Sequence, residues 1–232
     1  MLVTGFPAGM FQTNCYILAL GEGEPGRRGE CLVVDPGQDA TGPLRELLDQ
    51  MHLAPAAVLL THGHLDHTWS VAPVCEEYGV PAYIHPEDRY MLTDPGRGIG
   101  PAMGSMIAGV EFREPETVIE LAQGDELTLA GIDLVVDHTP GHTQGSVCLR
   151  TTAATADGPV PIALTGDTLF AGSIGRSDLP GGDHEQLLES IAERLLPLPD
   201  QTVVLPGHGG NSTIGRERVT NPFLAGLARK AQ

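Results

Sequence analysis

Apolar and polar residues alternate along the chain in patterns that predict short strands and amphipathic helices in turn. Glycines and prolines, 30 and 19 in number, separate these elements. The first half predicts strands over 14–20 and 31–35, a helix over 39–51, a strand over 56–60, a helix over 70–78 and a strand over 82–85. The first two strands are expected to form an antiparallel meander. The later alternation of strand and helix indicates parallel strands covered by helices.

The second half returns to strands after a segment without clear periodicity. Residues 93–113, which carry several Gly and Met, predict a mobile connection or a short helix that could cover a site. The pattern then predicts strands over 117–121, 126–129, 132–137, 146–151 and 161–165, a helix over 185–196 capped by Asp183, a strand over 202–205 and a helix over 216–230. Two β-rich blocks, each followed by helices, predict two sheets packed face to face with helices outside.

Composition and charge exclude several classes of function. The chain has 232 residues, and 30 Asp and Glu against 13 Lys and Arg give a net charge of −17. Such a charge repels nucleic acid and anionic membrane surfaces. No apolar run reaches the roughly 18 residues of a membrane span, and the N-terminus does not resemble a signal peptide. We therefore expect one domain, residues 1–232, in a cytoplasmic protein that acts on a small molecule; the sequence does not indicate an oligomeric state.

The densest chemical signal directly follows the predicted strand 56–60. Within six residues the chain places His62, His64, Asp66 and His67. In an extended loop, residues two apart point the same way, so His62 and His64 can converge on one ion. Asp66 and His67 continue around the turn and can face a second ion. The sequence therefore predicts two adjacent metal sites.

Three further segments end a predicted strand with a polar residue at a glycine turn. They carry His142, Asp167 and His208. Because glycine lets the backbone approach closely and aims the neighbouring side chain, we expect each to add one ligand. The set of five His and two Asp contains no thiolate and suits Zn, Fe or Mn. The four cysteines have no C-x-x-C spacing and are expected to be buried free thiols.

The order T-H-x-H-x-D-H, P-G-H, G-D-T and P-G-H, which spans Thr61 to His208, resembles the metallo-β-lactamase superfamily. This resemblance implies an α/β (α+β) fold, a four-layer αβ/βα sandwich of two mixed β-sheets flanked by helices. It also implies how two divalent ions, Zn or alternatively Fe or Mn, are held. The implied ligands are His62, His64 and His142 for one ion, Asp66, His67 and His208 for the other, and Asp167 as the bridge.

Within the superfamily, residues 165–183 and 213–224 are similar to glyoxalase II, the hydroxyacylglutathione hydrolases, especially the short bacterial type. The resemblance implies hydrolysis of S-2-hydroxyacyl-glutathione, such as S-lactoylglutathione to lactate and thiol. Only residues 209–232 follow His208, so we expect a short helical extension in place of the C-terminal helical domain of longer members. The thiol carrier therefore stays open, and another low-molecular-weight thiol would need the same chemistry.

The ligand set explains how such a hydrolysis could proceed without a Ser or Cys nucleophile. Two cations about 3.5–4 Å apart share a water, lower its pKa toward neutrality and polarise the thioester carbonyl. Asp66 and Asp167 are the expected catalytic carboxylates, Asp167 as the bridge and Asp66 also as a guide for the proton of the hydroxide. A thiolate leaves readily, so little general-acid help is needed.

Three residues outside the ligand set are candidates for supporting roles. Arg176 lies on a glycine-rich loop and could bind an anionic substrate or pair with Asp178. Arg216 could add a further cationic contact. Asp35, in a Val-Asp-Pro-Gly turn, is a hypothesis for support of the metal ligands, the alternative being a simple turn residue. Surface or helix-dipole roles are expected for His52 and His184. For His85 and His138 a structural role is favoured, the alternative for His138 being a place near the site, since it precedes the Thr-Pro-Gly-His turn.

Two other functions compete with thioester hydrolysis. Persulfide dioxygenases of the same superfamily use one iron, which His62, His142 and Asp167 would hold here. Those enzymes commonly carry Cys-Gly-Arg where this chain has Ile174-Gly-Arg, which favours the hydrolase. Zinc β-lactamases have Cys or Ser in place of Asp167 and are exported. A non-catalytic metal-binding module is the remaining alternative.

Overall fold

The computed structural model describes residues 1–100, 107, 109–156 and 158–227. In these residues the first sheet has six strands in the order β1-β2-β3-β4-β5-β6. They span Leu2–Ala8 (β1), Thr13–Ala19 (β2), Gly29–Val34 (β3), Leu53–Leu59 (β4), Ala82–Ile84 (β5) and Val118–Glu120 (β6). The first three strands pair antiparallel, and β3 to β6 pair in parallel. The predicted meander and the parallel strands that follow it are confirmed.

The second sheet also has six strands in the described ranges, in the order β14-β13-β10-β9-β8-β7. It is antiparallel except for the parallel pair of β10 and β13. Its strands span Glu126–Leu129 (β7), Ile132–His138 (β8), Val147–Thr155 (β9), Gly158–Gly166 (β10), Val203–Pro206 (β13) and Ser212–Thr213 (β14). A small separate hairpin joins Leu169–Phe170 (β11) to Ser173–Ile174 (β12).

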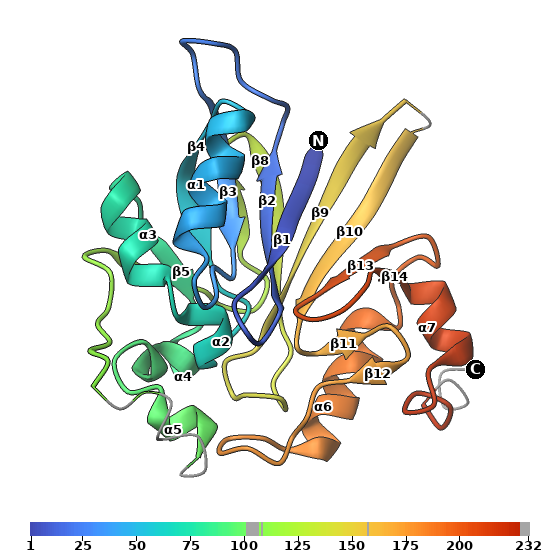
Figure 1. Cartoon of the computed structure of the whole chain (residues 1–232). Coiled ribbons are helices and arrows are strands. Elements are labelled where there is room, and N and C mark those ends of the chain that lie inside the picture. Colours follow the sequence, from blue (N-terminus) through green and yellow to red (C-terminus); the bar gives the residue numbers. More distant parts are fainter. Residues whose placement is uncertain (101–106, 108, 157, 228–232) are drawn as a thin grey trace.

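Helices cover the outer face of each sheet (Figure 1). On the first sheet these are α1 (Thr41–Gln50) and α3 (Val71–Tyr78), and on the second α6 (His184–Ser190), which continues as a π-helical stretch over Ile191–Leu195. The shorter helices are α2 (Leu65–Thr68), α4 (Pro86–Arg89), a 3₁₀ turn at Tyr90–Leu92, α5 (Gly96–Ile99) and α7 (Ile214–Thr220). No helix of the described residues is long and apolar enough to cross a bilayer.

The strand β3 shows why the layers assemble as they do. Successive side chains of a strand point to opposite faces. Cys31 and Val33 pack toward α1, where Leu44 is fully buried, and Leu32 packs between the two sheets. A run that is apolar at every position therefore fits a strand buried on both faces. Together with the core beneath α6, this gives the predicted four layers of two mixed sheets flanked by helices.

Two sequence predictions missed the ends of the chain. The pattern did not predict β1, because Gly5 and Pro7 interrupt its apolar run. Both residues suit an edge strand: Pro7 has no N–H for a further partner, and a Cβ on Gly5 would lie 2.3 Å from the Cys15 carbonyl oxygen. The predicted helix over 216–230 is wrong in extent, because α7 ends at Thr220. Pro222 forces the preceding Asn221 into extended backbone, with ψ at 117°.

The segment predicted to be a mobile connection or a short helix does contain a short helix, α5. Residues 101–106 and 108 of that segment lie outside the described residues, and its proposed covering role stays a prediction. Four strands, β4, β8, β10 and β13, end at the same edge of the sandwich (Figure 1). The loops that follow these four strands carry the candidate ligands.

Candidate metal centre

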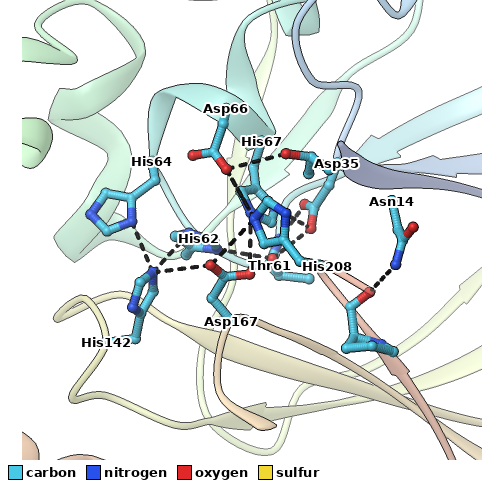
Figure 2. Close-up of polar contacts among 12 residues, drawn as sticks. Asn14, Asp35, Thr61, His62, His64, Asp66, His67, His142, Asp167 and His208 are labelled. Carbon is cyan, nitrogen blue, oxygen red and sulfur yellow. Dashed lines mark hydrogen bonds and ion pairs between the residues drawn. The ribbon is translucent and has the colours of Figure 1, made fainter. Parts of the chain in front are cut away.

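The seven predicted ligands meet at one edge of the sandwich (Figure 2). The loop after β4 and the start of α2 provide four of them, and the loops after β8, β10 and β13 provide one each. Their ligand atoms form three sets, and within each set the atoms lie within 4.8 Å of one another. The sets are His62, His64 and His142; His62, His67 and Asp167; and Asp66, His67 and His208. The first and the last of these sets are called the first trio and the second trio below.

The first trio consists of three buried imidazoles. His142 Nε2 lies 2.8 Å from His64 Nδ1 and 3.2 Å from His62 Nε2. All three side chains are at most 4% exposed. Three nitrogens thus surround one small space that solvent barely reaches.

Hydrogen bonds on the far side of two rings fix which nitrogen faces this space. His142 Nδ1 lies 2.7 Å from the Arg176 carbonyl oxygen, which can only accept, so Nδ1 carries the proton. Thr61 Oγ1 donates to Asp35 Oδ2 at 2.6 Å, and it therefore accepts from His62 Nδ1 at 3.1 Å. Both Nε2 atoms consequently present lone pairs to the same space, as metal ligands do.

Burial also keeps the rings of His62 and His64 neutral. It lowers the pKa of His62 well below its ordinary value, and the neighbouring His67 and His142 lower it further. Burial, followed by His142, lowers the pKa of His64 to about 3. His62 and His64 are therefore in the unprotonated form that binds a cation at neutral pH.

The second trio contains a carboxylate and is more open. Asp66 Oδ2 lies 3.1 Å from His208 Nε2 and 3.4 Å from His67 Nε2. The side chains of His208 and Asp66 are 30% and 20% exposed, whereas that of His67 is fully buried. Burial raises the pKa of Asp66, but His67 and His208 outweigh it, and the net shift is downward. Asp66 is accordingly ionised.

Asp167 lies between the two trios. Its Oδ1 is 3.3 Å from His67 Nε2, and its Oδ2 is 3.6 Å from both His142 Nε2 and His208 Nε2. Burial acts to raise the pKa of Asp167, but His67 more than offsets it and the pKa is lowered. The adjacent turn has no room for a side chain, since a Cβ on Gly207 would lie 2.2 Å from Asp167 Oδ1. One ionised carboxylate thus contacts residues of both trios.

Asp35 supports residues of both trios from behind. This buried side chain accepts hydrogen bonds from Thr61 N–H at 2.8 Å, from Thr61 Oγ1 and from His67 Nδ1 at 2.9 Å. His67 therefore turns Nε2 toward the site, and Thr61 passes the same constraint to His62. A simple turn residue would not need these contacts.

Two atoms in the centre show what the site fits. Among the described residues, the buried side-chain atoms without a hydrogen-bond partner are His64 Nε2, Thr202 Oγ1 and, between the two trios, His67 Nε2 and Asp167 Oδ1. Leaving such atoms unpaired is costly, and native proteins rarely do so. A shared divalent cation would satisfy the last two, and the N/O donor set is of the kind that binds Zn, Fe or Mn.

Strand β2 holds the second trio through polar side chains that sequence reasoning missed. Thr13 Oγ1 donates to Asp66 Oδ2 at 3.1 Å. Asn14 Nδ2 donates to the carbonyl oxygens of Pro206 and Gly209, both at 3.0 Å, and so holds the turn that carries His208. Figure 2 shows Asn14 beside this part of the site. The only available signal was polar residues at the start of an otherwise apolar strand.

The predicted substrate contacts lie at the surface. Arg176 forms an exposed ion pair with Asp178, with Nε 2.8 Å from Oδ1. Arg216 is exposed in the first turn of α7, where its backbone N–H bonds to Thr213 Oγ1. Neither guanidinium forms a described hydrogen bond or ion pair with the seven ligands, and substrate binding by both stays a prediction.

The other histidines and the cysteines lie in structural settings. His85 and His138 stack with ring centroids 4.1 Å apart, and His138 Nε2 donates to the Gln144 carbonyl oxygen. His184 begins α6, and His52 follows α1. All four cysteines are free and buried, as predicted.

The metallo-beta-lactamase superfamily model matches residues 8–208, and the chain belongs to this superfamily. It is 55% identical to an uncharacterized protein of Mycobacterium tuberculosis, over 99% of this chain and all of that one. It is 36% identical to a probable metallo-hydrolase of Bacillus subtilis, over 96% of this chain and 97% of that protein. With the hydroxyacylglutathione hydrolase GloC of Haemophilus influenzae the identity is 32%, over 94% and 95%.

Two solved structures share the fold at substantial identity. The BLEG-1 B3 metallo-beta-lactamase is 37% identical with a TM-score of 0.80, over 97% of this chain and all of that chain. TTHA1623 in a di-iron-bound form is 35% identical with a TM-score of 0.74, over 95% and 100%. The predicted metallo-β-lactamase fold is confirmed.

Proposed function

We propose that this protein is a two-metal hydrolase that cleaves the thioester of a 2-hydroxyacyl-thiol, either S-lactoylglutathione or the corresponding derivative of another small thiol. The observation that carries the proposal is Asp167, whose two oxygens lie 3.3 to 3.6 Å from ligand atoms of both trios. The similarity to the hydroxyacylglutathione hydrolase GloC of Haemophilus influenzae supports the choice of thioester.

The first trio would hold one ion, the second trio the other, and Asp167 both. Two divalent ions held in this way supply a hydroxide nucleophile at neutral pH and polarise the acyl carbonyl. Zn, Fe and Mn all suit the donor set, and the similarity to TTHA1623 in its di-iron-bound form supports iron as one of the candidate metals. We place the whole chain, residues 1–232, in one catalytic domain.

The protein's own residues would then manage orientation and protons. Thr13 and His208 both engage Asp66 Oδ2, which leaves Oδ1 as the oxygen to take a proton from the attacking water. The Arg176 carbonyl and Asp35 keep the ligand rings in the required tautomers. The leaving thiol needs no protonated side chain, because a thiol pKa near 8.5 makes the thiolate a good leaving group. Arg176 and Arg216 remain the candidates for an anionic part of the substrate.

A panel of acyl-thiols tests the proposal directly. Purified protein should release free thiol from 2-hydroxyacyl-thiols, which a thiol-reactive dye detects, and the carrier that gives the highest kcat/KM identifies the thiol. Absence of turnover on every member of a broad panel, in protein with its metals bound, would refute thioester hydrolysis.

A second candidate is β-lactam hydrolysis, which the similarity to the BLEG-1 B3 metallo-beta-lactamase favours. The same chemistry would open a lactam amide in place of a thioester. We expect a chromogenic cephalosporin to be cleaved far more slowly than the best acyl-thiol. The reverse order would make the lactamase the better description. Oxygen consumption with a persulfide would instead support the dioxygenase.

A further inference from the structure

Asp88 is a buried carboxylate that the proposed chemistry does not use. It lies in α4, which carries none of the seven ligands, and its side chain is 1% exposed. Its Oδ2 accepts from Gly63 N–H at 2.8 Å and from Thr143 Oγ1 at 2.6 Å, and its Oδ1 accepts from Gly145 N–H at 2.7 Å. Three donors thus converge on one carboxylate away from water.

The three donors belong to the two loops that carry the first trio. Gly63 stands between His62 and His64, and Thr143 follows His142 directly. The first loop follows β4 of one sheet, and the second follows β8 of the other. The first trio is therefore assembled from both halves of the sandwich, and the Asp88 carboxylate joins these halves beside it.

The residues around Asp88 are closely packed. A Cβ on Gly145 would lie 2.6 Å from Asp88 Cγ, and one on Gly63 would lie 2.7 Å from the Asp88 carbonyl oxygen. The Thr143 hydroxyl donates to Asp88 and can accept a hydrogen bond from Ser146 Oγ, which lies 2.7 Å from Thr143 Oγ1. Both loops are therefore held at a fixed distance from the carboxylate.

We propose that Asp88 is the positioning residue of the first trio: it sets the distance between the His62–His64 loop and the His142 loop, and thereby the metal affinity of that trio alone. This inference rests on the proposed two-metal centre. A charged group that orients metal ligands typically changes metal affinity 10- to 100-fold when it is lost.

The test is a titration of metal-stripped protein with Co²⁺, monitored through the visible absorption of the bound ion. Because the two trios provide different ligands, their Co²⁺ spectra differ and the two binding steps can be separated. In Asp88→Asn, an amide group would face N–H and O–H donors. We expect one step to weaken by about 10- to 100-fold and the other to stay within about twofold. Hydrogen exchange at the Gly63 and Gly145 amides should become faster in the same variant.

Glu217→Gln is the matched control. Glu217 is also fully buried and also accepts three hydrogen bonds, from Gly172 N–H, Ser212 Oγ and Asn221 Nδ2, but its partners carry no ligand. This variant should lose thermal stability and keep both binding steps. If it weakens the same step as Asp88→Asn, the effect is general destabilisation and the inference is wrong.

A second pair of variants decides the matter if Asp88→Asn does not fold. Thr143→Val removes one donor and should weaken the same single step by about tenfold, whereas Thr143→Ser keeps the hydroxyl and should restore it. Equal weakening of both steps, or no change in either, would overturn the inference. Wild-type protein that binds no Co²⁺ would overturn the proposed function as well as this inference. Wild-type protein that binds two Co²⁺ ions, with no selective loss in the variants, would overturn this inference alone.

Discussion

The two halves of the metal centre differ in composition and in access to solvent. The first trio is made of histidines alone, each at most 4% exposed. The second trio contains Asp66 and is open through His208, whose side chain is 30% exposed. A closed site of three histidines beside an open site that contains a carboxylate would suit tight binding of one ion and access of a substrate to the other. We therefore expect the two ions to differ in affinity and exchange rate.

The residues that hold the ligands in place also differ between the two trios. Asp88 joins two loops beside the first trio, whereas Asp35 contacts His67 of the second trio directly and His62 of the first only through Thr61. The second trio is held by Thr13 and Asn14 at the start of β2. Substitutions at these positions should separate the halves, and the residues that touch both should give the largest effects.

Asp167→Ala should abolish the difference between the halves by removing their shared ligand. We expect hydrolysis of the best acyl-thiol to fall by about a thousandfold or more, since several kcal/mol of transition-state stabilisation depend on the paired ions. Steady-state kinetics with metal analysis measures this. Asp133→Ala, an exposed aspartate on β8, is the control. An Asp167→Ala variant with the wild-type rate would exclude the bridging role.

Asp35→Asn should weaken both trios together. The amide would turn N–H groups toward the Thr61 and His67 donors, so both ligand rings lose their fixed tautomers. The expected loss is about 10- to 100-fold in metal affinity at both sites, measured by competition with a coloured chelator. A loss confined to one site would show that Thr61 does not transmit the constraint to His62.

Thr13→Val should affect the open trio alone. It removes the hydroxyl that donates to Asp66, and a hydrogen bond to a charged group is worth about 1.5–3 kcal/mol. We expect about tenfold weaker binding of the second ion and an unchanged first ion, by titration as above. Thr13→Ser should behave as wild type. If both ions weaken equally, the halves are not independent.

Arg176→Ala should leave both halves intact. The Arg176 side chain is exposed and pairs with Asp178, whereas its backbone carbonyl holds His142. Metal content and thermal midpoint should therefore stay unchanged. If the guanidinium binds an anionic substrate, KM rises severalfold at constant kcat, and an unchanged KM would remove Arg176 from the substrate contacts.

The sequence allowed the fold and the metal-binding cluster to be predicted because both depend on local patterns. The apolar runs predicted most strands. Residues 62–67 were recognised as metal ligands because they contain three His and one Asp within six positions. Asp88 and Thr13 could not be found, because an Asp after His-Pro-Glu and a Thr at a strand start look like ordinary capping and surface residues. Their partners lie 25 or more positions away in the sequence. The end of α7 was missed because the effect of Pro222 was outweighed by the apolar pattern beyond it.

Metal content per chain tests the two-metal centre most directly. Protein purified without added metal or chelator would be analysed for all transition metals, with chain concentration measured independently. We predict about two ions per chain, as Zn, Fe or Mn. A single iron per chain that added metal does not raise would contradict the two-metal hydrolase and favour the mononuclear dioxygenase.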